Sequence, residues 1–207
     1  IALGLLVDLR VDRRRAAGPH HHAVAVVYET AGQLGRIVRR LGLAAVQACH
    51  DQARAAEQRD LPPFRRDVWG HTAYVEGWAL YAETLGFELG LYADPLSRFG
   101  HLQSQAFRAA RLVVDTGLHA FGWSRERAQA LLREHTALSE HELVNEVDRY
   151  IGWPGQAVSY KMGEIAIRAL RRRLEGGAGF SLRGFHDRLL ALGPVPLPVL
   201  EQELATP

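Results

Sequence analysis

A helical spacing of apolar residues dominates the chain from residue 71 onward and limits the folds that it can adopt. Val75, Trp78, Ala79, Ala82 and Leu85, for example, recur at positions that share one face of an α-helix. No segment shows a convincing alternation of apolar and polar residues, which is the pattern of a half-buried strand. The sequence therefore predicts an all-α fold.

Turn and capping residues divide this region into successive helices. Ser139 and Glu142 have the S-x-x-E spacing of a capping box, and Ser124 is a suitable N-cap for the preceding helix. Pro154 suits a first helical position, and the prolines at positions 194, 196 and 198 are expected to follow the end of the last helix. The predicted helices cover residues 71–90, 96–120, 125–138, 140–151, 154–175 and 181–192.

The chain divides into two parts at the Pro62-Pro63 pair. Residues 61–207 are the helical region, whereas residues 1–60 are expected to form an arm or a decayed helical segment, rich in Ala, Arg and Val. A length of 207 residues fits one domain with such an arm. Because the chain starts without Met inside an apolar pattern, we interpret it as part of a longer protein.

The composition argues against several classes of protein. The 25 basic and 23 acidic residues are mixed along the chain and give a net charge of +2, which argues against nucleic acid as a partner. No apolar run reaches the roughly 18 residues that indicate a membrane span. The single cysteine, Cys49, excludes an internal disulfide and favours a reducing compartment, so we expect a cytoplasmic protein. The sequence predicts no oligomeric state.

Glu76 places a carboxylate inside an otherwise apolar helical segment. A carboxylate that borders a buried helix face is unusual unless it is paired or binds a metal. Two interpretations remain open at this point. Glu76 is a metal ligand, or it flanks the core and hydrogen-bonds a neighbouring helix.

A polar stripe crosses the apolar helix at 96–120. Arg108, Arg111, Asp115 and His119 follow one another at intervals of three or four positions and therefore share one face. Asp115 is spaced to pair with Arg111 or with His119, and a pair with His119 would fix the tautomer of that imidazole. The alternative is a solvated helix edge with surface salt bridges.

Two polar donors lie in the first turns of the helix that follows Pro154. The Tyr160 hydroxyl and the Lys161 ammonium group are suited to stabilise an oxyanion, and Gly163 allows another backbone or a ligand to approach closely. The alternative is a tyrosine that packs between helices beside a solvated lysine.

Five segments together, in their order along the chain, carry a resemblance to a known family. They are residues 72–83, which include the sequence EGWALYAE, and residues 108–119, 149–157, 160–163 and 185–187. On these segments the chain resembles a bacterial family of unknown function whose members look like gluzincin-type zinc metallopeptidases. The resemblance covers about residues 61–204 and implies a multi-helix, metallopeptidase-like carboxy-terminal domain.

The metal site of this family looks like a helix of sequence HExxPGHH, with a third zinc ligand from the glutamate that corresponds to Glu76. In this chain the matching window ends at His50. Leu43 replaces its first histidine, Ala44 replaces the general-base glutamate, and Cys49 replaces the next-to-last histidine. The resemblance thus implies Glu76, His50 and Cys49 as the remaining metal ligands. Zinc is expected for the family, but these ligands predict weak binding or none, since a catalytic zinc takes three protein ligands.

The resemblance also implies roles for polar residues of the helical region. His119 and Tyr160 would be transition-state donors, and Arg149 would bind a substrate carboxylate or anchor the structure. We expect Glu76, His119, Arg149 and Tyr160 to converge on one cavity, because isolated buried polar groups are costly. The supporting or substrate-binding residues would be Arg111, Asp115, Gln156 and Lys161.

The leading functional prediction is a fragment of a zinc-dependent peptidase that is inactive as written, with a peptide or small molecule as the substrate of an active form. The alternative is a helical remnant that serves only as a structural or binding module. His20–His22 is either a substitute ligand set or a solvated loop. Residues 1–60 reflect a reading-frame shift or true divergence. A helical regulator or nucleic-acid binder ranks last, because the sequence has no basic stripe.

Overall fold

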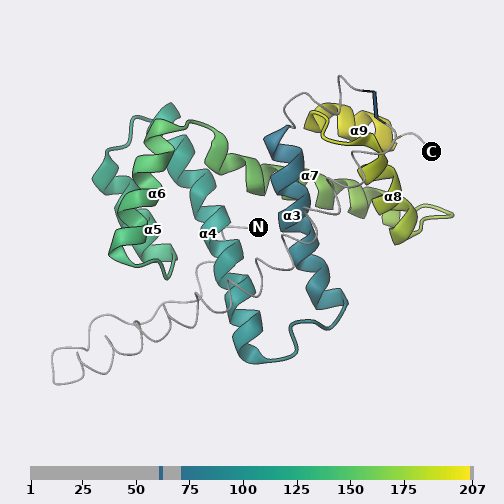
Figure 1. Ribbon diagram of the computed structural model, residues 1–207, viewed down its shortest axis with the longest axis horizontal. Coiled ribbons are helices and arrows are strands. Elements are labelled where there is room, and N and C mark those ends of the chain that lie inside the picture. Colours follow the sequence, from purple (N-terminus) through teal and green to yellow (C-terminus); the bar gives the residue numbers. More distant parts are fainter. Residues whose placement is uncertain (1–60, 63–70, 206–207) are drawn as a thin grey trace.

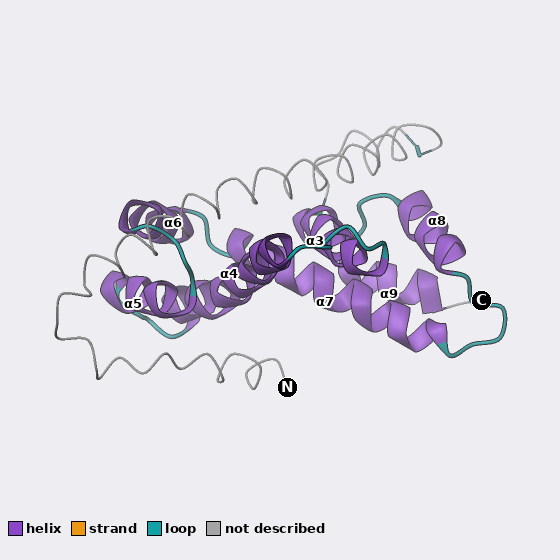
Figure 2. Ribbon diagram, turned by 90° about the horizontal axis from the view of Figure 1, so that it is seen from below, coloured by secondary structure: helices purple, strands orange, loops and turns teal. Residues whose placement is uncertain are grey.

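The computed structural model describes residues 61–62 and 71–205, and the predicted all-α class is confirmed there. Seven helices and no strand occupy this part of the chain (Figures 1 and 2). None of these helices has the length and apolar character needed to cross a membrane. The helices are α3 (Thr72–Glu88), α4 (Pro95–Ala120), α5 (Arg125–His135), α6 (Glu140–Gly152), α7 (Gln156–Glu175), α8 (Leu182–Leu192) and α9 (Leu197–Ala205).

The six predicted helices are confirmed, with ends that differ by a few residues. The predicted capping box of α6 is present, since Ser139 and Glu142 each bond the backbone N–H of the other. The prediction that Pro154 opens the next helix is wrong. Gly155 follows it with φ of 82°, a left-handed conformation that glycine adopts readily, and α7 begins one residue later.

Helix α9 was not predicted, because the prolines near its start indicated a break. Pro198 is its second residue, where the backbone N–H has no partner within the helix and a proline is tolerated. The sequence pattern indicated that Pro198 prevents a helix, whereas Pro198 lies in the first turn of one.

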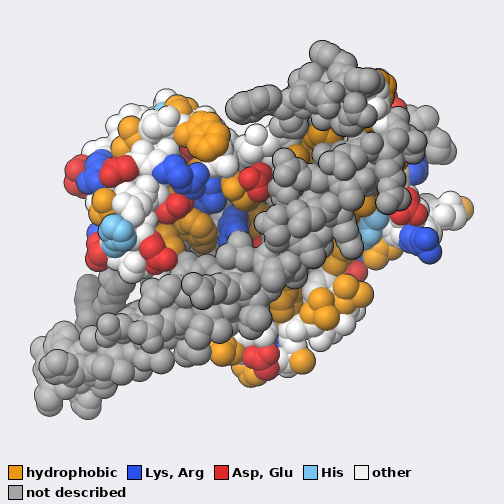
Figure 3. All heavy atoms as spheres, in the orientation of Figure 1, with side chains coloured by type: hydrophobic (Ala, Val, Ile, Leu, Met, Phe, Trp, Pro, Cys, Tyr) orange, Lys and Arg blue, Asp and Glu red, His pale blue; other side chains and the backbone are white. Residues whose placement is uncertain are grey.

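Two apolar cores hold the helices together, and α7 contributes to both. One core packs α3, α7, α8 and α9 around the buried rings of Tyr74, Trp78 and Tyr81. The other packs α4, α5 and α6 around Val114 and Leu132, with Ala157 from the start of α7. Figure 1 shows α7 running from the group of α5 and α6 to the group of α8 and α9. On the face seen in Figure 3, acidic and basic side chains are interspersed over the α5–α6 end.

Helices α3 and α7 approach each other most closely at a pair of glycines. A Cβ atom added to Gly163 would lie 1.8 Å from the carbonyl oxygen of Ala73 and 2.7 Å from Cα of Gly77. The close approach anticipated at Gly163 is therefore made by the backbone of α3. It fixes α3, which carries Glu76, against the helix that carries Tyr160.

Candidate functional site

A polar network fills the junction where the carboxy-terminal half of α4 meets the end of α6 and the start of α7. Asp115, which is buried, accepts the backbone N–H of Gly155 at 3.1 Å and 3.2 Å through its two oxygens. The amino-terminal end of a helix carries a partial positive charge, so a carboxylate is favoured there. Asp115 thus joins α4 to the first residue before α7.

The side-chain oxygen of Gln156 lies between two guanidinium groups. It accepts hydrogen bonds from Arg111 on α4 at 3.2 Å and from Arg149 on α6 at 2.8 Å. The amide nitrogen of the same side chain donates to the Tyr160 hydroxyl at 3.4 Å. A neutral acceptor therefore occupies the point where two cations and one hydroxyl converge.

Arg111 is 4% exposed, which is unusual for a charged side chain. Its guanidinium carbon lies 4.3 Å from the centre of the Tyr160 ring and 5.5 Å from that of Tyr150. It makes no ion pair with any residue that the structure describes, and its Nε–H has no acceptor there. Burial lowers the pKa of Arg111, although the neighbouring tyrosines oppose this effect.

Glu146 provides the carboxylate on the other side of the network. Its Oε2 accepts hydrogen bonds from Arg149 at 2.8 Å and from the Tyr150 hydroxyl at 2.6 Å. Burial alone would raise the pKa of Glu146, but the two hydrogen bonds and the positive charges of Arg149 and Arg111 together outweigh it and lower that pKa. Glu146 is therefore ionised at neutral pH. It forms an ion pair with Arg149, and its charge also acts on Arg111, with which it forms no ion pair.

His119 joins the network through the backbone. Its Nε2 lies 2.9 Å from the carbonyl oxygen of Tyr150. Because a carbonyl only accepts, Nε2 is the donor of this hydrogen bond. The predicted pair between Asp115 and His119 is not formed in the described structure. Asp115 is buried and points at the start of α7, whereas His119 lies in the exposed last turn of α4.

Six of the predicted site residues thus meet at this junction. His119, Arg149 and Tyr160 lie there, and their predicted supporting residues Arg111, Asp115 and Gln156 lie beside them. The structure brings them together from three helices that are distant in sequence. We call these six residues, with Glu146 and Tyr150, the α4–α6–α7 network.

Lys161 points away from this network. Its ammonium group donates to the Gln105 side-chain oxygen at 2.5 Å and forms an ion pair with the buried Glu164 at 2.5 Å. Glu164 also pairs with Arg168 at 3.1 Å. The alternative of a solvated Lys161 does not hold, because contacts with Gln105 of α4 and Glu164 of α7 enclose its head group. Its predicted supporting role stays a prediction.

Glu76 is half-buried on α3, and no hydrogen bond or ion pair to a described residue is formed by its carboxylate. It lies one residue before Gly77, which packs against Gly163, one helical turn beyond Tyr160 on α7. It also shares a face of α3 with Glu83, seven positions further on, which accepts from Ser104 of α4 at 3.3 Å. Glu76 therefore lies on the face of α3 that carries Glu83, and no hydrogen bond or ion pair among the described residues joins it to the α4–α6–α7 network.

The predicted metal site falls largely outside the described residues. Cys49, His50 and the His20–His22 cluster all lie there, as do Leu43 and Ala44. Within residues 61–62 and 71–205, no three His, Cys, Asp or Glu side chains are grouped so that they can hold a metal ion. Glu76 is the one predicted ligand in this part, so the described residues by themselves do not form a zinc site.

Two members of the network, Glu146 and Tyr150, were not among the predicted site residues. Their spacing carried a signal, since Glu146 lies three positions before Arg149 and four before Tyr150. The signal was ambiguous because the same spacing also produces ordinary surface pairs on a helix.

The fold and the network define an all-α domain with a polar junction of three helices that contains a buried arginine, Arg111. Residues 50–204 match the family described as bacterial protein of unknown function (DUF885). The chain belongs to this family. No curated protein matches the sequence.

Two solved structures are similar to the chain. One is a "putative lipoprotein" from Colwellia psychrerythraea, with 46% identity, a TM-score of 0.67 and alignment over 70% of this chain. The other is a "putative lipoprotein of unknown function" from Shewanella oneidensis, with 23% identity, a TM-score of 0.70 and alignment over 77% of this chain, and it shows the fold alone. The chain spans 25% and 31% of the length of these two proteins. The predicted cytoplasmic location stays a prediction.

Proposed function

We propose that this chain carries the substrate-binding part of a zinc-peptidase-like site, and that it binds peptides without hydrolysing them as its sequence stands. The segments that resemble gluzincin-type peptidases contain most of the α4–α6–α7 network. The family itself is described only as being of unknown function, so the activity is our proposal.

The observation that carries this proposal is that the buried guanidinium of Arg111 forms no ion pair with a described residue. A buried guanidinium without a carboxylate partner is costly, and a bound carboxylate would relieve that cost. The oxygen of Gln156 already marks a position that both Arg111 and Arg149 reach. A carboxylate is a stronger acceptor for two cations than an amide oxygen. The terminal carboxylate of a peptide would therefore displace Gln156 and bind between the two arginines.

The approach to this position lies on the side of Arg149, whose side chain is 34% exposed. Tyr160 lies next to it with a hydroxyl that accepts from Gln156 in the described structure. Once the carboxylate has displaced Gln156, this hydroxyl is free to donate to an oxygen of the bound peptide. A hydroxyl in this position is suited to stabilise negative charge that develops on a carbonyl oxygen.

The identities of residues 43 and 44 are the reason for proposing that the chain does not hydrolyse peptides. In the family these positions look like a zinc ligand and a general base, and neither Leu43 nor Ala44 has a side chain that can bind a metal or accept a proton. A bound zinc would activate a water molecule and polarise the substrate carbonyl. General-base help alone contributes roughly 10²–10⁴-fold to a rate.

A structural module is the second candidate, and one observation favours it. Gln156 and Glu146 already accept hydrogen bonds from most donors of the network. These contacts are sufficient to hold the three helices together without any ligand. In that case the network would bind no ligand.

Calorimetric titration with trialanine and with trialanine amide distinguishes the two candidates. We expect the affinity for the free acid to be at least about tenfold higher than for the amide, because a hydrogen bond to a charged group is worth about 1.5–3 kcal/mol. Gln156→Glu places a carboxylate between the arginines permanently, and it should abolish binding of the free acid while the protein stays folded. Equal binding of acid and amide, or no binding of either, would contradict the proposal.

A further inference from the structure

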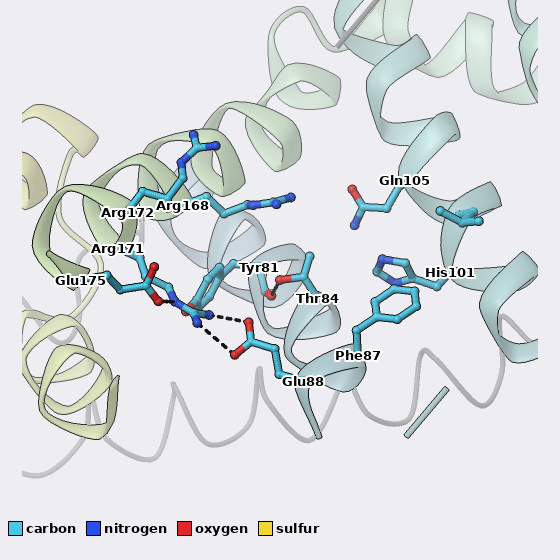
Figure 4. A pocket seen from close by; sticks show the side chains of 11 residues that line it. Tyr81, Thr84, Phe87, Glu88, His101, Gln105, Arg168, Arg171, Arg172 and Glu175 are labelled. Carbon is cyan, nitrogen blue, oxygen red and sulfur yellow. Dashed lines mark hydrogen bonds and ion pairs between the residues drawn. The ribbon is translucent and has the colours of Figure 1, made fainter. Parts of the chain in front are cut away.

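A separate pocket of about 520 Å³ lies between α3, α4 and α7, toward the end of the molecule at which α3 connects to α4 (Figure 4). No residue of the α4–α6–α7 network lines it. Pockets of this size accommodate small molecules. Its walls include the aromatic ring of Phe87, the side chain of Leu102 and the polar groups of His101, Gln105 and Arg168.

Two buried nitrogen atoms at this pocket have no hydrogen-bond partner in the described structure. His101 is 8% exposed, and its ring is held against Phe87 and Tyr92 with centroid distances of 4.8 Å and 5.1 Å, yet its Nδ1 has no partner. The Gln105 oxygen accepts from Lys161, whereas its Nε2 has no partner. Buried polar groups are nearly always satisfied, so each such nitrogen calls for a partner.

The side chains converge on the same space. Figure 4 shows the Arg168 guanidinium reaching from α7 toward Gln105 on α4, with His101 one turn before Gln105. Arg171, by contrast, turns toward Glu88, with which it forms an ion pair at 2.7 Å. The donors that lack a partner therefore lie on the side of the pocket where α4 faces Arg168.

The local charge is positive by about one unit. Glu164 is shared between Lys161 and Arg168, so one carboxylate faces two cations. On the opposite wall the two carboxylates of Glu88 and Glu175 form ion pairs with Arg171, and Arg172 adds a second cation to that wall. An ion with a single negative charge matches this arrangement better than a doubly charged one.

We propose that this pocket binds a small monocarboxylate with an apolar body. Its carboxylate accepts hydrogen bonds from Arg168, from Nε2 of Gln105 and from Nδ1 of His101, while its body packs against Phe87 and Leu102. A planar carboxylate suits the guanidinium fork of Arg168. This site is independent of the proposed peptide site, because the two share no residue.

The protonation state of His101 is compatible with this role. Burial lowers the pKa of His101 to about 4, so the ring is neutral at neutral pH. A neutral ring with its proton on Nδ1 donates one hydrogen bond without adding a second charge. The preference for a monoanion thus does not change near neutral pH.

Titration with benzoate tests the proposal, with benzamide and inorganic phosphate as comparison ligands. We expect benzoate to bind with a dissociation constant below about 10 mM, and benzamide and phosphate to bind about tenfold or more weakly. Phosphate binding more tightly than benzoate would overturn the monocarboxylate assignment. Absence of benzoate binding would overturn the site.

Gln105→Glu gives the most selective variant. It keeps an oxygen acceptor for Lys161 and replaces only the unpartnered nitrogen, so the fold should be preserved while benzoate binding falls about tenfold or more. Gln202→Glu, at an exposed position of α9, is the matched control, with the same change of charge outside this pocket and outside the α4–α6–α7 network, and it should leave benzoate binding unchanged. If Gln105→Glu fails to fold, benzoate binding is measured instead with Arg168→Gln, a change at a half-exposed position, and it should also fall. Unchanged benzoate affinity in a folded Gln105→Glu or Arg168→Gln protein would contradict the proposal.

Discussion

The glycine contact between α3 and α7 makes a quantitative prediction about stability. In Gly163→Ala the new Cβ would lie 1.8 Å from the Ala73 carbonyl oxygen and 2.7 Å from Cα of Gly77. Both atoms belong to the backbone, so no side chain is able to rotate away. The two helices must separate by about 1 Å or more to reach ordinary contact distances.

The cost of this separation exceeds the helical preference of alanine. Overpacking a core costs about 1–3 kcal/mol, and more where the backbone must move. Alanine recovers about 1 kcal/mol because it favours a helix more than glycine does. Since α3 and α7 share one of the two cores, we expect a net loss of about 2 kcal/mol. For a domain of this size that loss lowers the melting temperature by about 4–8 °C.

Thermal unfolding followed by circular dichroism measures this effect, with Gly152→Ala as the matched control. A Cβ on Gly152, the last residue of α6, meets no atom within 4 Å, and its backbone does not have positive φ. We expect the control to melt within about 2 °C of the unchanged protein. If Gly163→Ala were as stable as the control, the close helix crossing described here would be wrong.

Two further predictions concern pH and catalysis. Burial lowers the pKa of His101 from the ordinary value of 6.5 to about 4. Between these two pH values the histidine is protonated in the unfolded chain but not in the folded chain. The free energy of unfolding should therefore fall as pH drops from about 6.5 to about 4. His101→Phe, which keeps the aromatic contacts with Phe87 and Tyr92, should flatten this part of a stability-against-pH curve measured by urea unfolding; an unchanged slope would show that His101 is not the group responsible. We also expect mass spectrometry to detect no cleavage of a mixed peptide library by the chain in the presence of zinc, whereas zinc-dependent cleavage that disappears in Glu76→Ala would show that the site is active as written.

The local structure was largely readable from the sequence, because it depends on short-range rules. The apolar spacing around Trp78 and the S-x-x-E pair at Ser139 each involve residues within one or two helical turns. The hydrogen-bond partner of Asp115 could not be predicted from such short-range rules. Spacing along α4 pointed to His119, whereas Gly155 at the start of α7, forty residues away in sequence, supplies the backbone N–H that the carboxylate accepts.

The same limit applies to the pocket and to Lys161. The enclosure of Lys161 by Gln105 and Glu164 depends on how α4 and α7 cross, which no local pattern encodes. The spacing of Glu146 from Arg149 and Tyr150 was visible in the sequence. Only the burial of Glu146, which the structure shows, distinguishes these contacts from ordinary surface pairs. The part of the site that depends on long-range packing therefore required the structure.

Binding of free-acid trialanine to Arg111→Met, compared with the unchanged protein, tests the central proposal most directly. Methionine places an apolar side chain in the buried position and removes the guanidinium charge, and replacing a buried charge by an apolar residue is often neutral for stability or stabilising. We therefore expect a folded variant whose affinity for the free acid falls about tenfold or more, to the level of the amide. A folded Arg111→Met protein that binds the free acid as tightly as the unchanged chain would contradict the account.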